Sequence, residues 1–226
     1  MTSYRYEGSG GPGFPDGIKY LLIWNGIVFL LQQILRENFP LGLFGLVPNA
    51  VWHGYVWQLA TYMFLHGGFF HILFNMFVLW MFGSEIERLW GTRRFVSYYF
   101  FTGIGAALVN VAVTPHGHIP TIGASGAVYG ILLAYAVLFP ERRVLLYFLI
   151  PIPVRVFVIG LAAIALFSSL TQQGSQISHI THLGGFVFGW LYMRGFGPSD
   201  FWRRLTRRRR RGGMRVIDFT RDRYDR

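Results

Sequence analysis

The chain contains no cysteine among its 226 residues. This absence excludes disulfide bonds, a thiol nucleophile and cysteine-ligated metal sites. Charged residues are scarce as well: they make up 14% of the chain, whereas a soluble domain carries about 25%. The shortage of charge argues against an ordinary soluble globular protein.

Apolar residues take the place of the missing charge. They account for 53% of the chain, and the mean hydropathy is +0.39. Six apolar runs are typical of helices that enter or cross a bilayer; they are 18–35, 69–86, 95–113, 125–139, 154–170 and 180–193. We therefore predict an all-α polytopic membrane protein with a bundle of six transmembrane helices. Some runs are shorter than the ~20 residues of a full crossing, so we expect them to begin below the surface, where backbone lines a cavity.

The basic residues orient these helices. Arginines lie in the loops between the second and third runs and between the fourth and fifth, and an Arg-rich tail follows the sixth. The loops 114–122 and 171–179 contain neither lysine nor arginine, and Arg36 is the lone basic residue on that side. Because basic loops stay on the cytoplasmic side, we predict that both termini are cytoplasmic.

Composition divides the chain into three segments. We predict a flexible cytoplasmic leader at 1–17, a six-helix domain at 18–195 and an Arg-rich cytoplasmic tail at 196–226. Between Arg203 and Arg226 the tail holds eleven arginines and three aspartates. Beside a membrane helix, such a basic run is typical of a segment that contacts anionic lipid. We predict this partner and no nucleic acid.

The second apolar run opens with two polar side chains, His71 and Asn75. They are four residues apart and therefore share one face of a helix. Polar side chains inside a span are costly and face the bundle interior or a water-filled cavity. A hydrogen bond between helices explains the pair as well as a catalytic role does.

Ser125 lies in the stretch TIGASGAVYG, where the fourth run begins, and His182 lies near the start of the sixth. Glycines four residues apart follow each of them, at Gly126 and Gly130 and again at Gly185 and Gly189, a spacing typical of helices that pack closely. Close packing of the two helices would bring Ser125 within reach of His182. Taken singly, a serine in a helix more often serves packing or helix capping, and a histidine more often makes an ordinary polar contact.

Together these residues fit acyl-transfer chemistry. Serine is a weak nucleophile until a neighbouring base takes its proton, and imidazole suits that role near neutral pH. His71, Asn75 and the backbone N–H groups near Ser125 are candidate donors to an oxyanion. Tyr129 lies one turn after Ser125, where it would pack against the ring of His182. His66 is ambiguous, because it would either line the outer cavity or contact the substrate.

Two other histidine pairs leave a metal-dependent function open. His116 and His118, or His179 and His182, have spacings that permit zinc binding. However, the chain has no HExxH motif, and the outer halves of the later runs contain no Asp or Glu. We therefore expect no metal and no cofactor.

Three motifs in this order resemble those of the rhomboid family of intramembrane serine proteases: HILFN, GASG followed by Tyr129, and HLGGFVFG. The resemblance covers about residues 18–195. It implies a Ser125–His182 dyad, an oxyanion hole formed by His71 and Asn75 with a turn kept open by Gly123, and cleavage of transmembrane substrates near the outer face. By analogy we expect a bacterial inner membrane.

The sequence departs from the family in the long connection 36–66, where interfacial aromatic residues predict a membrane-embedded loop. Relatives often carry Trp-Arg there, whereas this chain has Trp57-Gln58. The change puts the anchoring of the loop in doubt. A non-catalytic rhomboid-like protein that escorts membrane clients remains an alternative, although inactive relatives typically lack the serine or the histidine.

Overall fold

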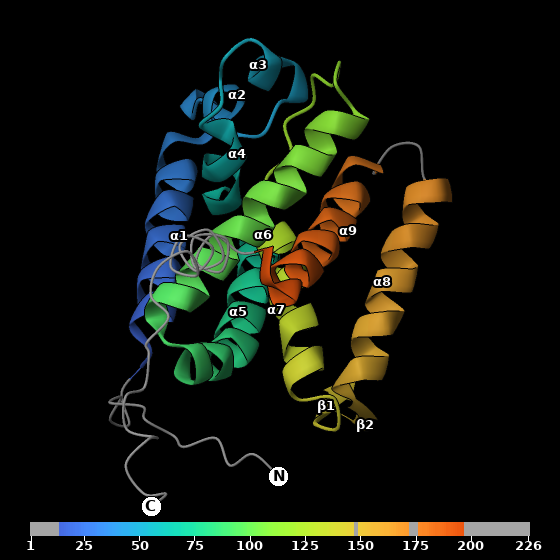
Figure 1. Ribbon diagram of the computed structural model, residues 1–226. Helices are drawn as coiled ribbons and strands as arrows, with labels where there is room; N and C mark the ends of the chain where they lie inside the picture. Colours follow the sequence, from blue (N-terminus) through green and yellow to red (C-terminus); the bar gives the residue numbers. More distant parts are fainter. Residues whose placement is uncertain (1–13, 147–148, 172–175, 197–226) are drawn as a thin grey trace, which may run out of the picture.

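The computed structural model describes residues 14–146, 149–171 and 176–196. Long helices form a bundle whose centre is α6, α7 and α9, with α1, α5 and α8 around them (Figure 1). The bounds of these helices are α1 Asp16–Leu35, α5 Phe69–Trp90, α6 Thr92–Val113, α7 Ser125–Leu138, α8 Val154–Thr171 and α9 Gln176–Leu191. Each begins and ends within five residues of a predicted apolar run, because the bilayer-length apolar pattern decides where a helix forms.

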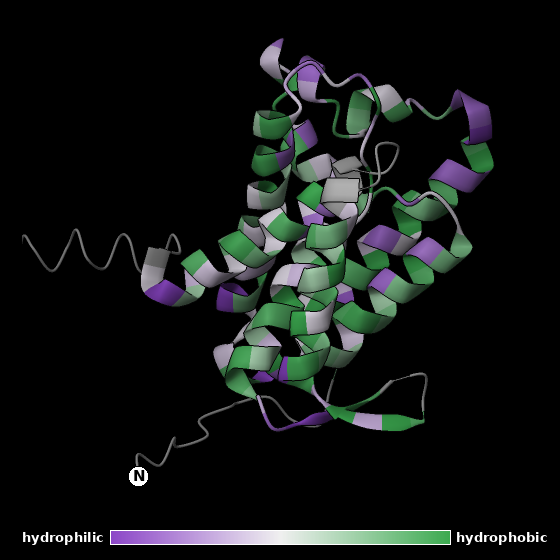
Figure 2. Ribbon diagram, turned by 90° about the vertical axis from the view of Figure 1, so that its right-hand side faces the viewer, coloured by the Kyte–Doolittle hydropathy of each residue, from purple (hydrophilic) through white to green (hydrophobic). Residues whose placement is uncertain are grey.

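Three of the described helical segments are long and apolar enough to cross a membrane. They are Asp16–Asn38, Phe69–Trp90 and Thr92–Val113, and α7 and α8 contain shorter apolar stretches. Large apolar side chains cover the outside of the bundle, including Ile34 at 74% exposure and Phe167 at 68% (Figure 2). A water-soluble bundle would turn such residues inward. The described helices therefore form a membrane bundle.

The predicted leader and tail lie outside the described residues, apart from residues 14–17 and 196. A buried carboxylate holds the first turn of α1, which is the first helix of the described residues. Glu87 of α5 accepts hydrogen bonds from the backbone N–H groups of Gly17 (2.7 Å) and Ile18 (2.8 Å) and from the Thr92 hydroxyl (2.6 Å). A carboxylate is favoured there because the first N–H groups of a helix lack partners within it.

The long connection between α1 and α5 is folded into short helices (Figure 1). We call residues 36–66 the first loop. Its elements are the 3₁₀ turns η1 Arg36–Asn38 and η2 Tyr62–Phe64 and the helices α2 Leu41–Phe44, α3 Pro48–Trp52 and α4 Gln58–Thr61. A single β-bridge joins Leu46 of this loop to Thr121, just before α7.

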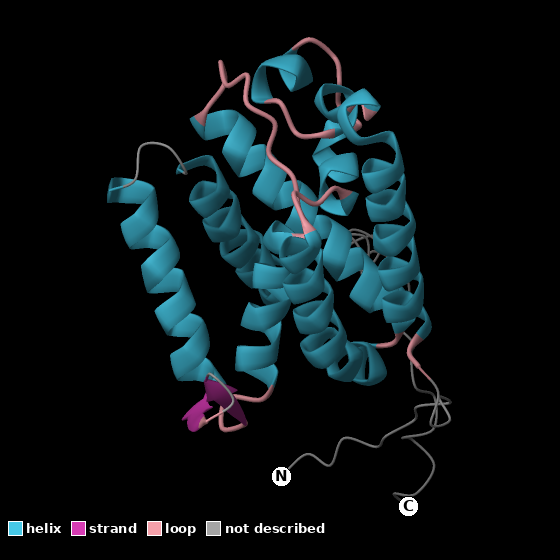
Figure 3. Cartoon of the chain, turned by 180° about the vertical axis from the view of Figure 1, so that it is seen from behind, coloured by secondary structure: helices cyan, strands magenta, loops and turns pink. Residues whose placement is uncertain are grey.

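A small β-hairpin corrects the all-α prediction. Strands β1 Arg143–Leu146 and β2 Ile150–Pro153 pair antiparallel between α7 and α8, with Val144 opposite Ile152 (Figure 3). Pro151 and Pro153 argue against a strand in the sequence. Proline is nevertheless tolerated in an edge strand, and both strands of a two-stranded hairpin are edges. The last described element is the short helix η3 Tyr192–Phe196.

Candidate active site

Ser125 is the first residue of α7, directly after a turn, and it is half-buried. Gly123 in that turn has φ +123°, a backbone conformation that side-chain-bearing residues rarely adopt. A Cβ at Gly123 would also lie 2.8 Å from Nε2 of His71. Position 123 therefore requires glycine, both for its dihedral angle and for the approach of the histidine.

His182 lies on α9, and its Nε2 is 2.8 Å from the Oγ of Ser125. The close contact between α7 and α9 makes this distance possible. A methyl group at Gly185 would overlap the carbonyl of Gly126, and one at Gly189 would lie 3.3 Å from the Cα of Gly130. The predicted packing of these two helices is confirmed, and with it the meeting of serine and histidine.

Tyr129 stacks on the imidazole of His182. The ring centroids are 4.2 Å apart, and the planes are inclined by 4°. The ring of Phe186 contacts the ring of Tyr129 edge to face, and the two ring centroids are 5.1 Å apart. Because the rings of α7 and α9 pack in this way, the imidazole has little freedom to rotate away from Ser125.

His71 and Asn75 of α5 complete the group. Nδ1 of His71 accepts a hydrogen bond from the Gly67 N–H (3.2 Å), so in the neutral ring the hydrogen resides on Nε2, the atom that faces Gly123. Asn75 is buried and donates one amide hydrogen to the His71 carbonyl (2.8 Å). Its second amide hydrogen remains available, since the group carries two.

His66 lies behind His71 and does not line an open cavity. The rings meet edge to face with centroids 5.1 Å apart, and His66 is 2% exposed. Neither of its ring nitrogens has a hydrogen-bond partner among the described residues. Burial, helped by the nearby His71, lowers the pKa of His66 to about 4, so its ring is neutral at physiological pH. The buried ring of His66 therefore packs against His71 and has little exposed surface.

Gln58 anchors the first loop, where the sequence left the anchoring in doubt. Its buried amide oxygen accepts from the Val47 N–H (2.9 Å), and its amide nitrogen donates to the carbonyls of Gly42 (2.8 Å) and Leu43 (3.3 Å). The neighbouring Trp57 also donates to Leu43, at 2.9 Å. The neutral amide therefore ties together both sides of the loop without an arginine.

A buried polar network that the sequence did not reveal holds the two halves of the site together. The Asn110 amide of α6 donates to the hydroxyls of Thr121 (3.2 Å) and Thr181 (2.8 Å). Thr121 leads into the turn before Ser125, and Thr181 is next to His182. Asn110 is a polar residue within an apolar run, near its end, which is the signal that could have identified it.

The remaining histidines do not assemble into a metal site. His179 lies near His182, with ring centroids 6.2 Å apart. Within the described ranges, no three His, Asp or Glu side chains gather closely enough to hold a metal ion.

Sequence comparisons show the family of the chain. The family model of the Rhomboid domain matches residues 53–199, which is more than half of the chain. The chain belongs to the rhomboid family. That stretch includes all seven residues named for the site, from His66 to His182.

Several rhomboid proteins are similar to this chain. Rhomboid protein 1, mitochondrial, of Saccharomyces cerevisiae is 32% identical over 134 residues, which cover 57% of this chain and 38% of the relative. The mouse Presenilin-associated rhomboid-like protein, mitochondrial, is 34% identical over 148 residues, 62% of this chain and 38% of the relative. Rhomboid protease GluP of Bacillus subtilis is 30% identical over 155 residues, 68% and 29% of the two chains. The match thus spans well under half of each relative.

The predicted bacterial inner membrane is corrected by these rhomboid relatives. The yeast and mouse proteins are both named mitochondrial, which contradicts the expectation of a bacterial inner membrane. The prediction rested on chain size, topology and family analogy, together with the lack of cysteine. Chain size and topology follow from the bilayer as a solvent, and they do not distinguish one membrane from another.

Proposed function

We propose that this rhomboid chain is a serine endopeptidase that cleaves transmembrane segments of other membrane proteins. The observation that carries the proposal is the 2.8 Å separation of Ser125 Oγ and His182 Nε2 at the start of a membrane helix. A nucleophile within hydrogen-bond reach of a base whose ring is itself held in place is the arrangement that acyl transfer requires. The name of the Bacillus subtilis relative, a rhomboid protease, supports the same reaction.

The first chemical step follows from this geometry. His182 Nε2 takes the proton of the Ser125 hydroxyl while Oγ attacks the carbonyl carbon of the scissile peptide bond. The carbonyl oxygen becomes an oxyanion. Its donors are Nε2–H of His71, the second amide hydrogen of Asn75 and the free backbone N–H groups at the start of α7. The dipole of α7 favours negative charge at the same end.

The second step completes the reaction. His182 returns its proton to the nitrogen of the leaving peptide, the carbon–nitrogen bond breaks, and an acyl group remains on Ser125. A water molecule then gives a proton to His182 and attacks the acyl carbon, and the proton returns to Oγ as the ester breaks. Tyr129 keeps the imidazole in one plane throughout, which is the role that a third, acidic residue has in a triad.

The membrane arrangement is part of the proposal. Six helices cross or enter the bilayer, both termini lie on the arginine-rich side, and Ser125 and His182 open toward the other side. Substrate helices would be cut near that face, where water reaches the dyad. The Arg-rich tail would contact anionic lipid on the basic side.

The test is cleavage by the purified full chain in liposomes that contain a single-span substrate. We expect wild-type protein to cut the substrate and both Ser125→Ala and His182→Ala to lose activity by about 10⁴-fold or more. Ser97→Ala on α6 is the matched control, and it should cut like wild type. Undiminished cleavage by Ser125→Ala would refute the mechanism, and a folded wild type that cuts nothing would favour the client-binding alternative.

A further inference from the structure

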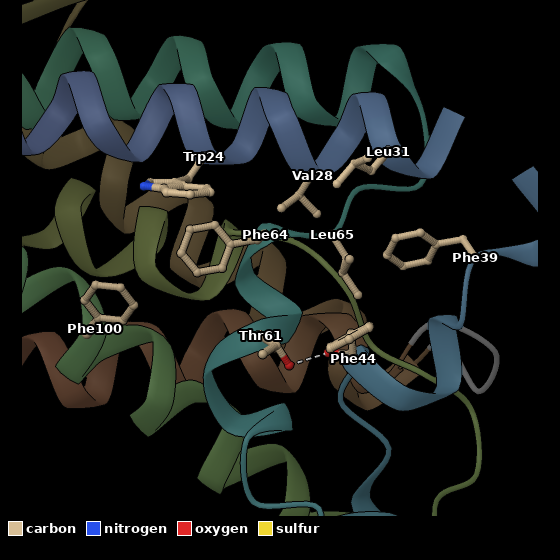
Figure 4. Close-up of a pocket in the computed structure, with 9 residues that line it drawn as sticks. All are labelled: Trp24, Val28, Leu31, Phe39, Phe44, Thr61, Phe64, Leu65 and Phe100. Carbon is tan, nitrogen blue, oxygen red and sulfur yellow. Dashed lines mark hydrogen bonds between the residues drawn. The ribbon is translucent and has the colours of Figure 1, made fainter. Parts of the chain in front are cut away.

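An apolar groove runs between α1 and the first loop (Figure 4), and Ser125 is not among the residues that line it. Its volume is about 570 Å³. Trp24, Val28 and Leu31 form one wall, because positions i, i+4 and i+7 share a helix face. Phe64 and Leu65 of the first loop form much of the opposite wall. The groove is therefore a place where α1 and the first loop leave space between them.

The lining offers an occupant few hydrogen-bonding groups. The Thr61 hydroxyl donates to the Phe44 carbonyl at 2.6 Å, and the indole N–H of Trp24 is the one other side-chain donor of the lining (Figure 4). Pockets for polar ligands carry a few well-placed polar groups that fix the ligand, and an apolar cavity does not hold ordered water. The chemistry of this groove suits a hydrocarbon chain.

The groove opens onto a surface that faces lipid. Along α1, next to the groove wall, the side chains of Ile27, Leu30 and Ile34 are 41%, 61% and 74% exposed. In a membrane bundle these side chains contact acyl chains, so the hydrocarbon phase continues from the surface of α1 into the groove. The bilayer itself thus supplies the occupant.

Charge at one end of the groove matches a phospholipid headgroup. Arg36 ends α1 five residues after Leu31 and three before Phe39, both of which line the groove. Its side chain is exposed and forms no ion pair with any described residue. Glu37 follows it and is exposed too, so this end presents one charge of each sign, as a zwitterionic headgroup does.

We propose that the groove binds one acyl chain of a zwitterionic membrane phospholipid, with the lipid phosphate at Arg36. The bound chain fills the space between α1 and the first loop and thereby steadies the loop in addition to the hydrogen bonds of Gln58. The inference rests on the membrane bundle and is independent of the proposed peptidase activity.

A photoreactive lipid tests the acyl-chain site. The full chain is reconstituted with phosphatidylcholine that carries a diazirine on one acyl chain, irradiated and digested, and labelled peptides are identified by mass spectrometry. We expect labelling of peptides that contain Phe39, Phe64 and Leu65. Val28→Trp or Leu31→Trp, each of which fills the groove, should lower this labelling about tenfold, which corresponds to roughly 1.4 kcal/mol of binding free energy. Leu30→Trp, on the exposed face of the same helix, should leave it unchanged.

Other outcomes contradict the proposal. Equal labelling in Val28→Trp, Leu31→Trp and Leu30→Trp would mean ordinary contact with bulk lipid. Loss of the label on addition of a transmembrane peptide would identify the groove as a peptide site. The headgroup is tested with a diacylglycerol probe, which lacks the phosphate. This probe should label wild type several-fold less than the phosphatidylcholine probe does. In Arg36→Gln the two probes should label the protein equally. Equal labelling of wild type by both probes would overturn the assignment of Arg36.

Discussion

Gly185 of α9 packs so closely against Gly126 of α7 that a methyl group at position 185 would overlap the Gly126 carbonyl. This contact lies one turn from the Ser125–His182 hydrogen bond, which joins the same two helices. The spacing of the helices therefore sets the distance between serine and histidine. The first prediction follows from this relationship.

Gly185→Ala should push α9 away from α7 and lengthen the distance between Ser125 Oγ and His182 Nε2. We expect kcat/KM for a transmembrane substrate to fall by about 100-fold, since a displacement of about 1 Å in a catalytic group has an effect of that size. Gly160→Ala is the matched control, because no atom lies within 4 Å of the added methyl group. Wild-type activity in Gly185→Ala would show that the close packing does not set the geometry of the site.

Tyr129 should act through its ring and not through its hydroxyl. Tyr129→Phe retains the stack on His182 and should keep kcat/KM within about threefold of wild type, whereas Tyr129→Ala should lower it about tenfold, because an aromatic pair contributes about 1 kcal/mol. Steady-state kinetics on both variants distinguish the two roles. A large loss in Tyr129→Phe would instead indicate that the hydroxyl takes part.

Gln58 should carry much of the stability of the first loop. Gln58→Leu leaves the Val47 N–H and the Gly42 carbonyl without their partner, and each buried group without a partner costs about 1–3 kcal/mol. We expect the free energy of unfolding in detergent to fall by about 2–3 kcal/mol, with faster amide exchange at Val47. Gln33→Leu, an exposed change on α1, provides the control. Unchanged exchange at Val47 would contradict the anchoring role.

His66 should make folding sensitive to acid. Its pKa is about 4 in the folded chain and 6.5 when exposed, because burial disfavours the charged ring. The unfolded chain therefore binds the extra proton first, so the stabilising effect is complete above pH 6.5 and is lost as the pH falls toward 4. This loss amounts to at most roughly 3 kcal/mol, at 1.36 kcal/mol for each pKa unit.

The test for His66 is the melting temperature in detergent at pH 7 and pH 4.5. His66→Phe keeps a ring in the same space and should lose less stability than wild type over this interval, while the exposed His53→Gln should behave like wild type. An identical acid response in wild type and His66→Phe would contradict the assignment. Wild type and His66→Phe share every other histidine, so the difference between these two proteins isolates His66.

The helices of the bundle and most of the site could be predicted from the sequence, because both depend on local patterns. Apolar runs of bilayer length define the helices, and the glycine spacing after Ser125 and after His182 indicates which two helices pack closely. The arginine-poor loops predict that these side chains lie on the outer side of the membrane. These signals are short-range or periodic, and a single sequence records them.

The rest depends on contacts between distant segments with no pattern of their own. The partners of Gln58 are backbone groups of an irregular loop up to 16 residues away, and Asn110 reaches Thr181 across 71 residues. The sequence did not predict the hairpin at 143–153, because proline generally argues against a strand. Proline is tolerated in an edge strand, and both strands of this hairpin are edges. The burial of His66 depends on how the first loop folds against α5, which its sequence does not specify.

The central claim is that Ser125 is a nucleophile activated by His182. Its most direct test is the mass spectrum of the intact protein and its peptides after reaction with a fluorophosphonate, which phosphorylates activated serine hydroxyls. The account predicts a single adduct on Ser125 in wild-type protein, and a rate of adduct formation about 10³-fold or more lower in His182→Ala. Absence of the adduct in folded wild-type protein, or modification of Ser125 at the same rate without His182, would contradict it.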